Sequence, residues 1–333
     1  MRKTVKGFVH RQGVHCDSSA LRDVFEHHGF KFSEPMIFGL GSGLGFVYWK
    51  SKHMPFPFVG GRVKNLAENL CSNLGVTMKI SKTASKGRAY ETLKELISRN
   101  IPVMIHVDMP YLNYLGLSEE AHFGAHSVVV AGIDEEEEVV YIADTNFKGL
   151  QTATLEELEK ARSSKAKPFP PQNKWFTFNF PSKLSSIHDA IKRAVEQTLK
   201  NMLNPPIKNL GIKGIRHLAS ELLRWPRQYP PKQFAFGCEM TYIYLEEAGT
   251  GGGCFRHLYS RFLEEAGNVL KNKHLVASSK EYYEVGKKWT EVAHLIKQMP
   301  QTRVANSRKA KDLLLKIADD EERILCTLNM VEM

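Results

Sequence analysis

The spacing of apolar residues near the start of the chain predicts a helix. Over residues 18–28, Leu21, Val24 and Phe25 fall three and four positions apart, which places them on one helical face. Polar residues that favour helix N-termini stand at the beginning of this segment. We therefore expect a helix that begins just after Cys16.

Further along the first half, the pattern changes between helix and strand. Residues 90–99 predict an amphipathic helix, and residues 102–107 predict a short buried strand. Two segments rich in β-branched residues, 127–133 and 139–143, flank an acidic turn and predict a hairpin. Residues 175–180 predict one more strand, so the first half is expected to fold as an α+β domain.

The second half is expected to be all helical. A loop rich in Lys, Ser and Pro covers residues 163–173, and after Pro181 we find no strand pattern. We place the domain boundary there, which gives one domain over residues 1–180 and another over residues 181–333. Apolar residues three and four apart predict six bundle helices, at residues 187–203, 212–223, 234–248, 254–270, 280–298 and 307–327.

Composition and charge narrow the class of protein. The chain has 333 residues, of which 42% are apolar, so it can bury a sizeable core. Lys and Arg number 46 against 36 Asp and Glu, which favours either a solvated basic surface or a docking face for an acidic protein. We find no nucleic-acid-binding signature, no signal peptide and no apolar run of about 18 residues. Partners among nucleic acids and membranes are therefore not expected.

The cysteines suggest a reducing compartment. They are odd in number, scattered, and never arranged as Cys-x-x-Cys, which indicates neither a disulfide framework nor a metal site. The five are Cys16, Cys71, Cys238, Cys254 and Cys326. We therefore expect a cytoplasmic protein.

Three residues together predict a cysteine nucleophile. Cys16 stands at a predicted helix N-terminus, where the peptide dipoles favour thiolate over thiol. His126 opens a predicted strand, whose fixed backbone suits a general base. Asp144 follows the next strand, and antiparallel pairing would bring it beside His126 as an orienting carboxylate. Taken singly, each has a structural alternative: an inert buried cysteine, a core-edge histidine and a strand-ending aspartate.

The chain order of these residues is that of papain-like enzymes. We therefore expect a papain-like, cysteine-protease-type α+β domain followed by an all-helical domain that completes the cleft or docks a partner. The backbone N–H of Cys16 is one natural oxyanion donor, and the side chain of Gln12 or His10 is the candidate for the second. The spacing does not choose between them.

Two glycine-rich stretches are candidate binding segments. The first contains Gly41, Ser42 and Gly43, lacks a Rossmann or Walker register, and predicts either a loop lining the cleft or a structural turn. The second ends shortly before Arg256. Its N–H groups and that arginine would either hold an anionic group or form a plain turn between helices.

The sequence resembles the butirosin biosynthesis protein H family over nearly the whole chain. The resemblance rests on the His15-Cys16 pair, the stretch SEPMIFGLGSG at residues 33–43, the strand AHSVVV at residues 125–130, and GGGCFR at residues 251–256 followed by Tyr259 and Phe262. The glycine-containing stretch at residues 33–43 is the most specific of these.

This resemblance implies acyl transfer. The founding member is described as moving an aminoacyl group from the phosphopantetheine thioester of an acyl carrier protein to an amine of an aminoglycoside. Cys16, His126 and Asp144 match its nucleophile, base and orienting acid. An acyl carrier protein and a small-molecule amine are the implied partners, with no metal and no tightly bound cofactor. Glu34 is a candidate for binding a cationic amine.

Two alternatives use the same residues. In a hydrolase, whether peptidase, amidase or thioesterase, water would replace the amine. In a non-catalytic binding module, the fold would serve as a docking surface for a protein partner. Candidate amines that divert product from acid to amide would separate transfer from hydrolysis, and an unreactive Cys16 thiol would indicate the binding module. No motif specifies the donor, the acceptor or the oligomeric state.

Overall fold

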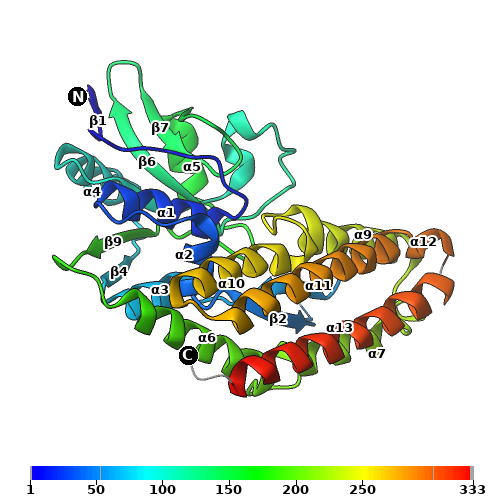
Figure 1. Cartoon of the computed structure of the whole chain (residues 1–333). Coiled ribbons are helices and arrows are strands. Elements are labelled where there is room, and N and C mark those ends of the chain that lie inside the picture. The colour runs from blue at the N-terminus through cyan, green and yellow to red at the C-terminus, as the bar shows by residue number, and fades with distance from the viewer. Residues whose placement is uncertain (1, 53, 303, 331–333) are drawn as a thin grey trace. The chain divides into compact units, whose positions relative to one another are not determined.

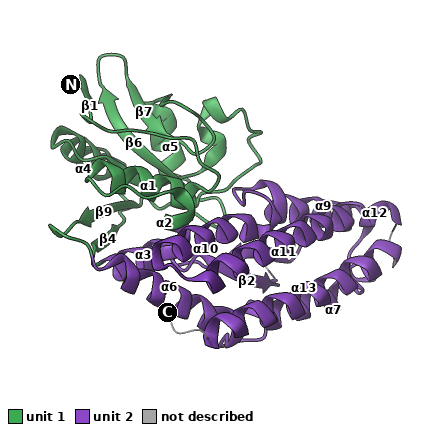
Figure 2. Ribbon diagram, in the orientation of Figure 1, with its two compact units in different colours: residues 1–37, 75–184 green, residues 38–74, 185–333 purple. Residues whose placement is uncertain are grey.

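The computed structural model describes residues 2–52, 54–302 and 304–330, and the chain divides into two compact units (Figures 1 and 2). Unit 1 comprises residues 1–37 and 75–184, and unit 2 comprises residues 38–74 and 185–333. The α+β N-terminal region and the mostly helical C-terminal region confirm the expected fold class. The division differs from the expected one because residues 38–74 belong with the helices of unit 2.

Unit 1 is built on a seven-stranded sheet. The strand order is β4-β9-β5-β6-β7-β8, β1 also pairs with β6, and each of these pairings is antiparallel. The strands are β1 (Arg2–Thr4), β4 (Thr77–Ser81), β5 (Val103–Val107), β6 (His126–Asp134), β7 (Val139–Ala143), β8 (Gln151–Thr154) and β9 (Trp175–Asn179). The helices are α1 (Cys16–His27), α4 (Lys86–Ser98) and α5 (Leu155–Ser163), with single turns η1 (Met109–Tyr111) and η2 (Asn113–Leu115).

Strands β6 and β7 form the predicted hairpin, whose turn is at the top of Figure 1. The register pairs Val129 with Ala143 and Asp134 with Val139. All nine residues of β6 are buried, which explains their nearly continuous apolar character. The first residue of β6 and the residue that follows β7 therefore lie at the same end of the hairpin.

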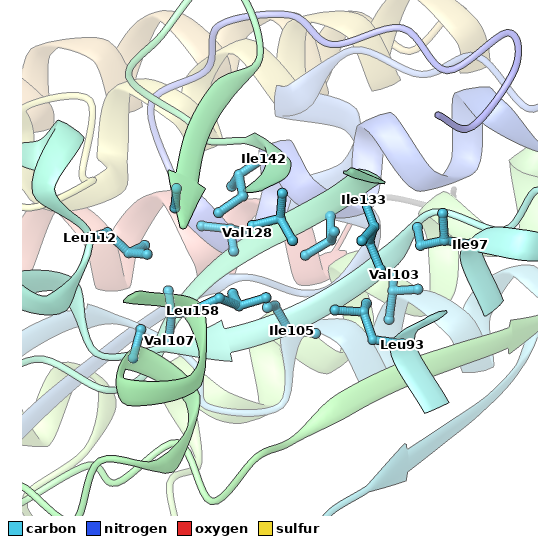
Figure 3. Packing of buried hydrophobic residues seen from close by; sticks show 14 of the residues in the cluster. Leu93, Ile97, Val103, Ile105, Val107, Leu112, Val128, Ile133, Ile142 and Leu158 are labelled. Carbon is cyan, nitrogen blue, oxygen red and sulfur yellow. The ribbon is translucent and has the colours of Figure 1, made fainter. Parts of the chain in front are cut away.

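The core of unit 1 lies against one face of this sheet (Figure 3). Alternate residues of β6, Val128 and Val130, share a cluster with Ile105 of β5 because strand side chains alternate between faces. Leu93 of α4 and Leu158 of α5 cover the cluster. Helix α1 also contacts β5 and β6, and its predicted apolar face is fully buried. The helix that carries Cys16 is thus fixed to the strand that carries His126.

Unit 2 combines a β-hairpin with helices. The hairpin pairs β2 (Leu44–Trp49) with β3 (Phe58–Arg62), and α2 (Glu34–Leu40) begins in unit 1 and ends in unit 2. The other helices are α3 (Leu66–Leu74), α6 (Ile187–Leu203), α7 (Gly211–Leu222), α8 (Trp225–Gln228), α9 (Pro231–Tyr242), α10 (Arg256–Leu270), α11 (Lys273–Lys297), α12 (Met299–Thr302) and α13 (Val304–Met330), with short turns η3 (Ile243–Glu247) and η4 (Gly253–Phe255).

The helices predicted after Pro181 all occur, with shifted ends. The helix expected from Cys254 begins at Arg256, because Cys254 and Phe255 have φ angles of 54° and 69°, outside the right-handed helical region. The helix expected from residue 280 begins at Lys273, since Asn272 caps it by accepting from the first turn. Local periodicity therefore located these helices better than it located their ends.

Candidate active site

Cys16 is the first residue of α1, as the sequence predicted. His15 is the N-cap with an extended backbone (φ −124°, ψ 127°), and its ring Nδ1 accepts from the backbone N–H of Ser18. The N–H groups of a first helical turn have no acceptor within the helix, and they give this end a partial positive charge. The Cys16 side chain is partly exposed. It therefore combines an electropositive backbone setting with access for a substrate.

The loop before Cys16 is held by the carboxylate of Glu34. This group accepts hydrogen bonds from the backbone N–H groups of Val14 (3.0 Å) and His15 (2.8 Å) and from the Ser18 hydroxyl (3.0 Å). Burial raises the pKa of the Glu34 carboxyl, and these hydrogen bonds offset part of the rise. Glu34 is only 8% exposed. The carboxylate oxygens of Glu34 accept hydrogen bonds from the loop before Cys16 and from α1. Glu34 therefore anchors this loop and does not form the expected site for a cationic amine.

His126 lies between Cys16 and Asp144. Its Nε2 is 2.9 Å and 3.0 Å from the two carboxylate oxygens of Asp144, and Cys16 is near enough to contribute to the pKa of the ring. Burial lowers the pKa of His126, but the charge and hydrogen bond of Asp144 and the contact with Cys16 outweigh it and raise the pKa to about 10. Asp144 therefore favours the protonated form of the imidazole.

Asp144 has further partners that the sequence did not reveal. Burial raises its pKa, but His126, the Tyr114 hydroxyl and the backbone N–H of Thr145 outweigh that effect and lower it. The Tyr114 hydroxyl donates to Asp144 Oδ2 at 2.8 Å. No sequence spacing indicated Tyr114, since it lies in a turn 30 positions from its acceptor.

Helix α1 is also tied to this end of the hairpin by hydrogen bonds. The hydroxyls of Ser19 and Thr145 are 2.8 Å apart, and the backbone N–H of Gly13 donates to the carbonyl of Thr145 at 2.8 Å. On the other strand, the Ser127 hydroxyl donates to the Asp17 carboxylate. These contacts fix the residues adjacent to Cys16 against the neighbours of His126 and Asp144.

The two candidates for the second oxyanion donor differ sharply. Nδ1 of His10 is 2.6 Å from the Asp23 carboxylate, and Nε2 contacts the carbonyls of Asp144 (3.1 Å) and Phe147 (2.9 Å). Both ring nitrogens of His10 are thus occupied, Nδ1 by Asp23 of α1 and Nε2 by the segment after β7. Gln12 is exposed, and its amide donates to the nearby Asn146 carbonyl at 3.0 Å. Gln12 is the candidate whose side chain remains at the surface.

The candidate glycine loop lies in unit 2 and forms a packed turn. Ser42 is fully buried with φ 49°. A Cβ at Gly41 would lie 2.8 Å from Leu66, and one at Gly43 would lie 2.7 Å from the ring of Phe38. The close packing requires these glycines and supports the structural-turn alternative. The expectation of a cleft-lining loop gains no support from their burial.

Arg256 is fully buried and bound within unit 2. Its Nε and Nη2 donate to the two carboxylate oxygens of Glu321 at 2.8 Å and 3.0 Å. Its Nη1 donates to the carbonyls of Gly45 (3.1 Å), Gly61 (3.3 Å) and Cys254 (2.8 Å). Since its donors meet acceptors of the protein, Arg256 does not act as the anion-binding group expected beside the glycine run.

The family comparison agrees with the position of this site. Residues 15–145 match the family model described as Butirosin biosynthesis protein H, N-terminal, and this range contains Cys16, His126 and Asp144. Residues 156–328 match a second model, described as a domain of unknown function (DUF4872). The chain therefore combines a butirosin biosynthesis protein H N-terminal domain with a DUF4872 domain that spans about half of its length. No match is found among curated proteins.

This site thus brings a carboxylate into contact with an imidazole and places a cysteine thiol near that imidazole. A thiol beside such an imidazole can exist as a thiolate–imidazolium pair, which is a strong nucleophile with its proton held nearby.

Among the described residues, no helix is long and apolar enough to cross a membrane. The same residues bring together no cluster of three His, Cys, Asp or Glu side chains suited to a metal ion.

Proposed function

We propose that this protein is a cysteine-dependent acyltransferase of secondary-metabolite biosynthesis. In this proposal, an acyl or aminoacyl group passes from the phosphopantetheine thioester of an acyl carrier protein, through a Cys16 thioester, to an amine. The observation that carries the proposal is the His126–Asp144 pair, 2.9 Å apart, together with a partly exposed Cys16 at the start of α1 that raises the pKa of His126. Membership of a family named for butirosin biosynthesis supports the biosynthetic setting.

In the loading step, the Cys16 thiolate attacks the carbonyl carbon of the donor thioester. A new S–C bond forms, and the tetrahedral oxyanion then collapses with cleavage of the bond to the pantetheine sulfur. His126 holds the proton taken from Cys16 and gives it to the departing thiolate. Thioester exchange is nearly balanced in energy, so a preformed thiolate is the main requirement.

In the transfer step, an amine nitrogen attacks the acyl carbon on Cys16. His126, now neutral, accepts a proton from the attacking nitrogen, and the C–S bond to Cys16 breaks as the amide forms. The Cys16 thiolate and the His126 imidazolium are thereby regenerated. Asp144 stabilises the imidazolium of the enzyme before loading and after transfer. Its contact with Nε2 also fixes which ring nitrogen of His126 faces the carboxylate.

The backbone N–H of Cys16 is the first donor proposed for the oxyanion. It belongs to the first turn of α1, where N–H groups are directed away from the helix. The exposed amide of Gln12 is proposed as the second donor, reached by exchanging its bond to the Asn146 carbonyl for one to the oxyanion. The excess of Lys and Arg over Asp and Glu, 46 to 36, suits an acidic carrier protein.

The test is intact-protein mass after incubation with a panel of acyl carrier protein thioesters and simple thioester mimics. We expect an acyl adduct on the wild type and on Cys326→Ala, which removes another partly exposed cysteine. Cys16→Ala should gain no adduct. Addition of candidate amines to the acylated enzyme should then release amide and restore the original mass.

Three other results would overturn the proposal in different ways. An acyl-enzyme that releases only free acid with every amine would indicate a hydrolase of the same chemistry. A Cys16 thiol no more reactive towards iodoacetamide than a free cysteine in solution, with no adduct from any donor, would indicate a binding module. Acylation of Cys16→Ala at the wild-type level would exclude Cys16 as the nucleophile.

A further inference from the structure

Tyr114 makes a direct contact with the acidic end of the proposed catalytic set. It lies in η2, within the connection between β5 and β6, and its hydroxyl donates to Asp144 Oδ2 at 2.8 Å. Its ring packs edge-on against Phe147 at 5.5 Å between centroids. The ring and the hydroxyl are thus both fixed on the segment that contains Asp144.

Two side chains hold the carboxylate of Asp144 from different directions, in addition to the backbone N–H of Thr145. His126 Nε2 lies 2.9 Å and 3.0 Å from the two oxygens, and the Tyr114 hydroxyl occupies a further acceptor position on Oδ2. A carboxylate bound by a single donor can rotate about its Cβ–Cγ bond, whereas donors on two sides hold its plane fixed. The phenol remains protonated as a donor, because burial and the charge of Asp144 raise the pKa of Tyr114 far above neutrality.

The connection that carries Tyr114 is itself anchored. Asp108, at the end of β5, is fully buried and accepts from the backbone N–H of Phe123 (2.9 Å), the His122 ring (2.8 Å) and the Ser164 hydroxyl (2.6 Å). These bonds join the start of the connection to its end, just before β6. Tyr114 therefore lies on a connection whose two ends are hydrogen-bonded together, which restricts the position of its hydroxyl relative to Asp144.

We propose that Tyr114 is a positioning residue that holds the Asp144 carboxylate against His126 and so supports the proposed catalytic set of Cys16, His126 and Asp144. This inference rests on the proposed roles of Cys16, His126 and Asp144. Tyr114 does not touch Cys16 or a substrate in this scheme. Its effect on the Cys16 thiolate passes through Asp144 and the imidazolium that Asp144 stabilises.

The experiment measures the rate of Cys16 alkylation by iodoacetamide between pH 4 and pH 9 in the full-length protein, followed by mass on the peptide containing Cys16. Tyr114→Phe removes the hydroxyl and keeps the ring packing. We expect its alkylation midpoint to rise by up to about one pH unit, the size typical for a hydrogen bond to a charged group. Tyr111→Phe, in the same connection, is the matched control and should superimpose on the wild type.

A double-variant comparison shows whether Tyr114 acts through Asp144. Asp144→Ala should raise the midpoint more than Tyr114→Phe does, and adding Tyr114→Phe to Asp144→Ala should produce no further shift. A Tyr114→Phe midpoint equal to that of wild type, or lower, would overturn the proposal. So would a shift of equal size in the Asp144→Ala background. Alkylation needs no acyl donor, so these results are independent of whether the protein transfers acyl groups.

Discussion

The buried ion pair between Arg256 and Glu321 should make unit 2 sensitive to loss of a single charge. Both side chains are fully buried, and Glu321 also accepts a hydrogen bond from the Trp289 indole at 2.9 Å. The substitution Glu321→Gln keeps the size of the side chain but removes its charge. It leaves the Arg256 guanidinium buried, with backbone carbonyls as its remaining acceptors and a neutral amide in place of the carboxylate.

Removal of one partner from a buried pair costs about 3–5 kcal/mol, because the remaining charge loses its compensation while staying out of water. That is a large part of the roughly 5–15 kcal/mol by which folded proteins are stable. With a urea slope of about 2 kcal/mol per M, the unfolding midpoint should fall by roughly 2 M. Both carboxylate oxygens of Glu321 are used, so we expect a cost near the upper end.

Urea unfolding followed by far-ultraviolet circular dichroism measures this loss, because most helices belong to unit 2. Glu322→Gln, one position along α13, is the control: its partner Arg216 is at the surface, where ion pairs are worth at most about 1 kcal/mol. Equal midpoints for Glu321→Gln and Glu322→Gln would refute the reasoning. They would also revive the view that Arg256 serves a ligand, since its charge would then not depend on Glu321.

Two further predictions concern unit 1. Glu34→Gln should slow alkylation of Cys16 roughly tenfold, because only one of the two amide atoms can accept a hydrogen bond from the loop before Cys16. Glu26→Gln, in the last turn of α1, is the control. An unchanged Glu34→Gln rate would contradict the anchoring role. The raised pKa of His126 implies stability that is fully present below pH 6.5 and lost as the pH rises through about 10. The difference in unfolding free energy between wild type and His126→Gln should therefore shrink over that pH window. A constant difference would disprove that His126 is charged at neutral pH. In an Asp144→Asn background, the same difference should depend less on pH.

The order of the site residues was readable because each belongs to an element with a strong local pattern. The apolar spacing of Leu21, Val24 and Phe25 located α1, and the β-branched segments located β6 and β7. Antiparallel pairing then predicted that the residue after β7 would approach the start of β6. The observed contact between His126 and Asp144 is the geometry that this pairing would produce.

The segment around α2 was not readable in the same way. Its glycines suggested a loop, yet Gly39 lies in a helix, where a Cβ would come within 1.9 Å of the Phe262 ring. The glycine is required by a neighbour more than two hundred positions away, so tertiary packing overrides a local preference for a turn. The amino-acid composition changes only near Pro181. Nothing in it indicates that residues 38–74 pack with the helices after residue 185.

For a related reason, the sequence did not indicate Tyr114, and it suggested a different role for Glu34. Glu34 and Tyr114 act through hydrogen bonds to groups 19 and 30 positions away, in a loop and after a strand. A carboxylate in a glycine-containing motif suggests a ligand site, whereas the structure directs it to backbone N–H groups. Contacts of this kind depend on the tertiary structure, and the spacing of apolar and polar residues along the chain does not predict them.

The path of the chain also governs how the protein can be synthesised and dissected. It enters unit 2 at residue 38, leaves at residue 74 and returns only at residue 185. During translation, α3 emerges well before α6, which packs against it, so the face of α3 that α6 contacts stays exposed while the second segment of unit 1 is made. A fragment ending at residue 184 would retain that uncovered surface. An autonomous unit 1 would instead require excision of residues 38–74, and the interval before α6 emerges is when a nascent chain most needs a chaperone.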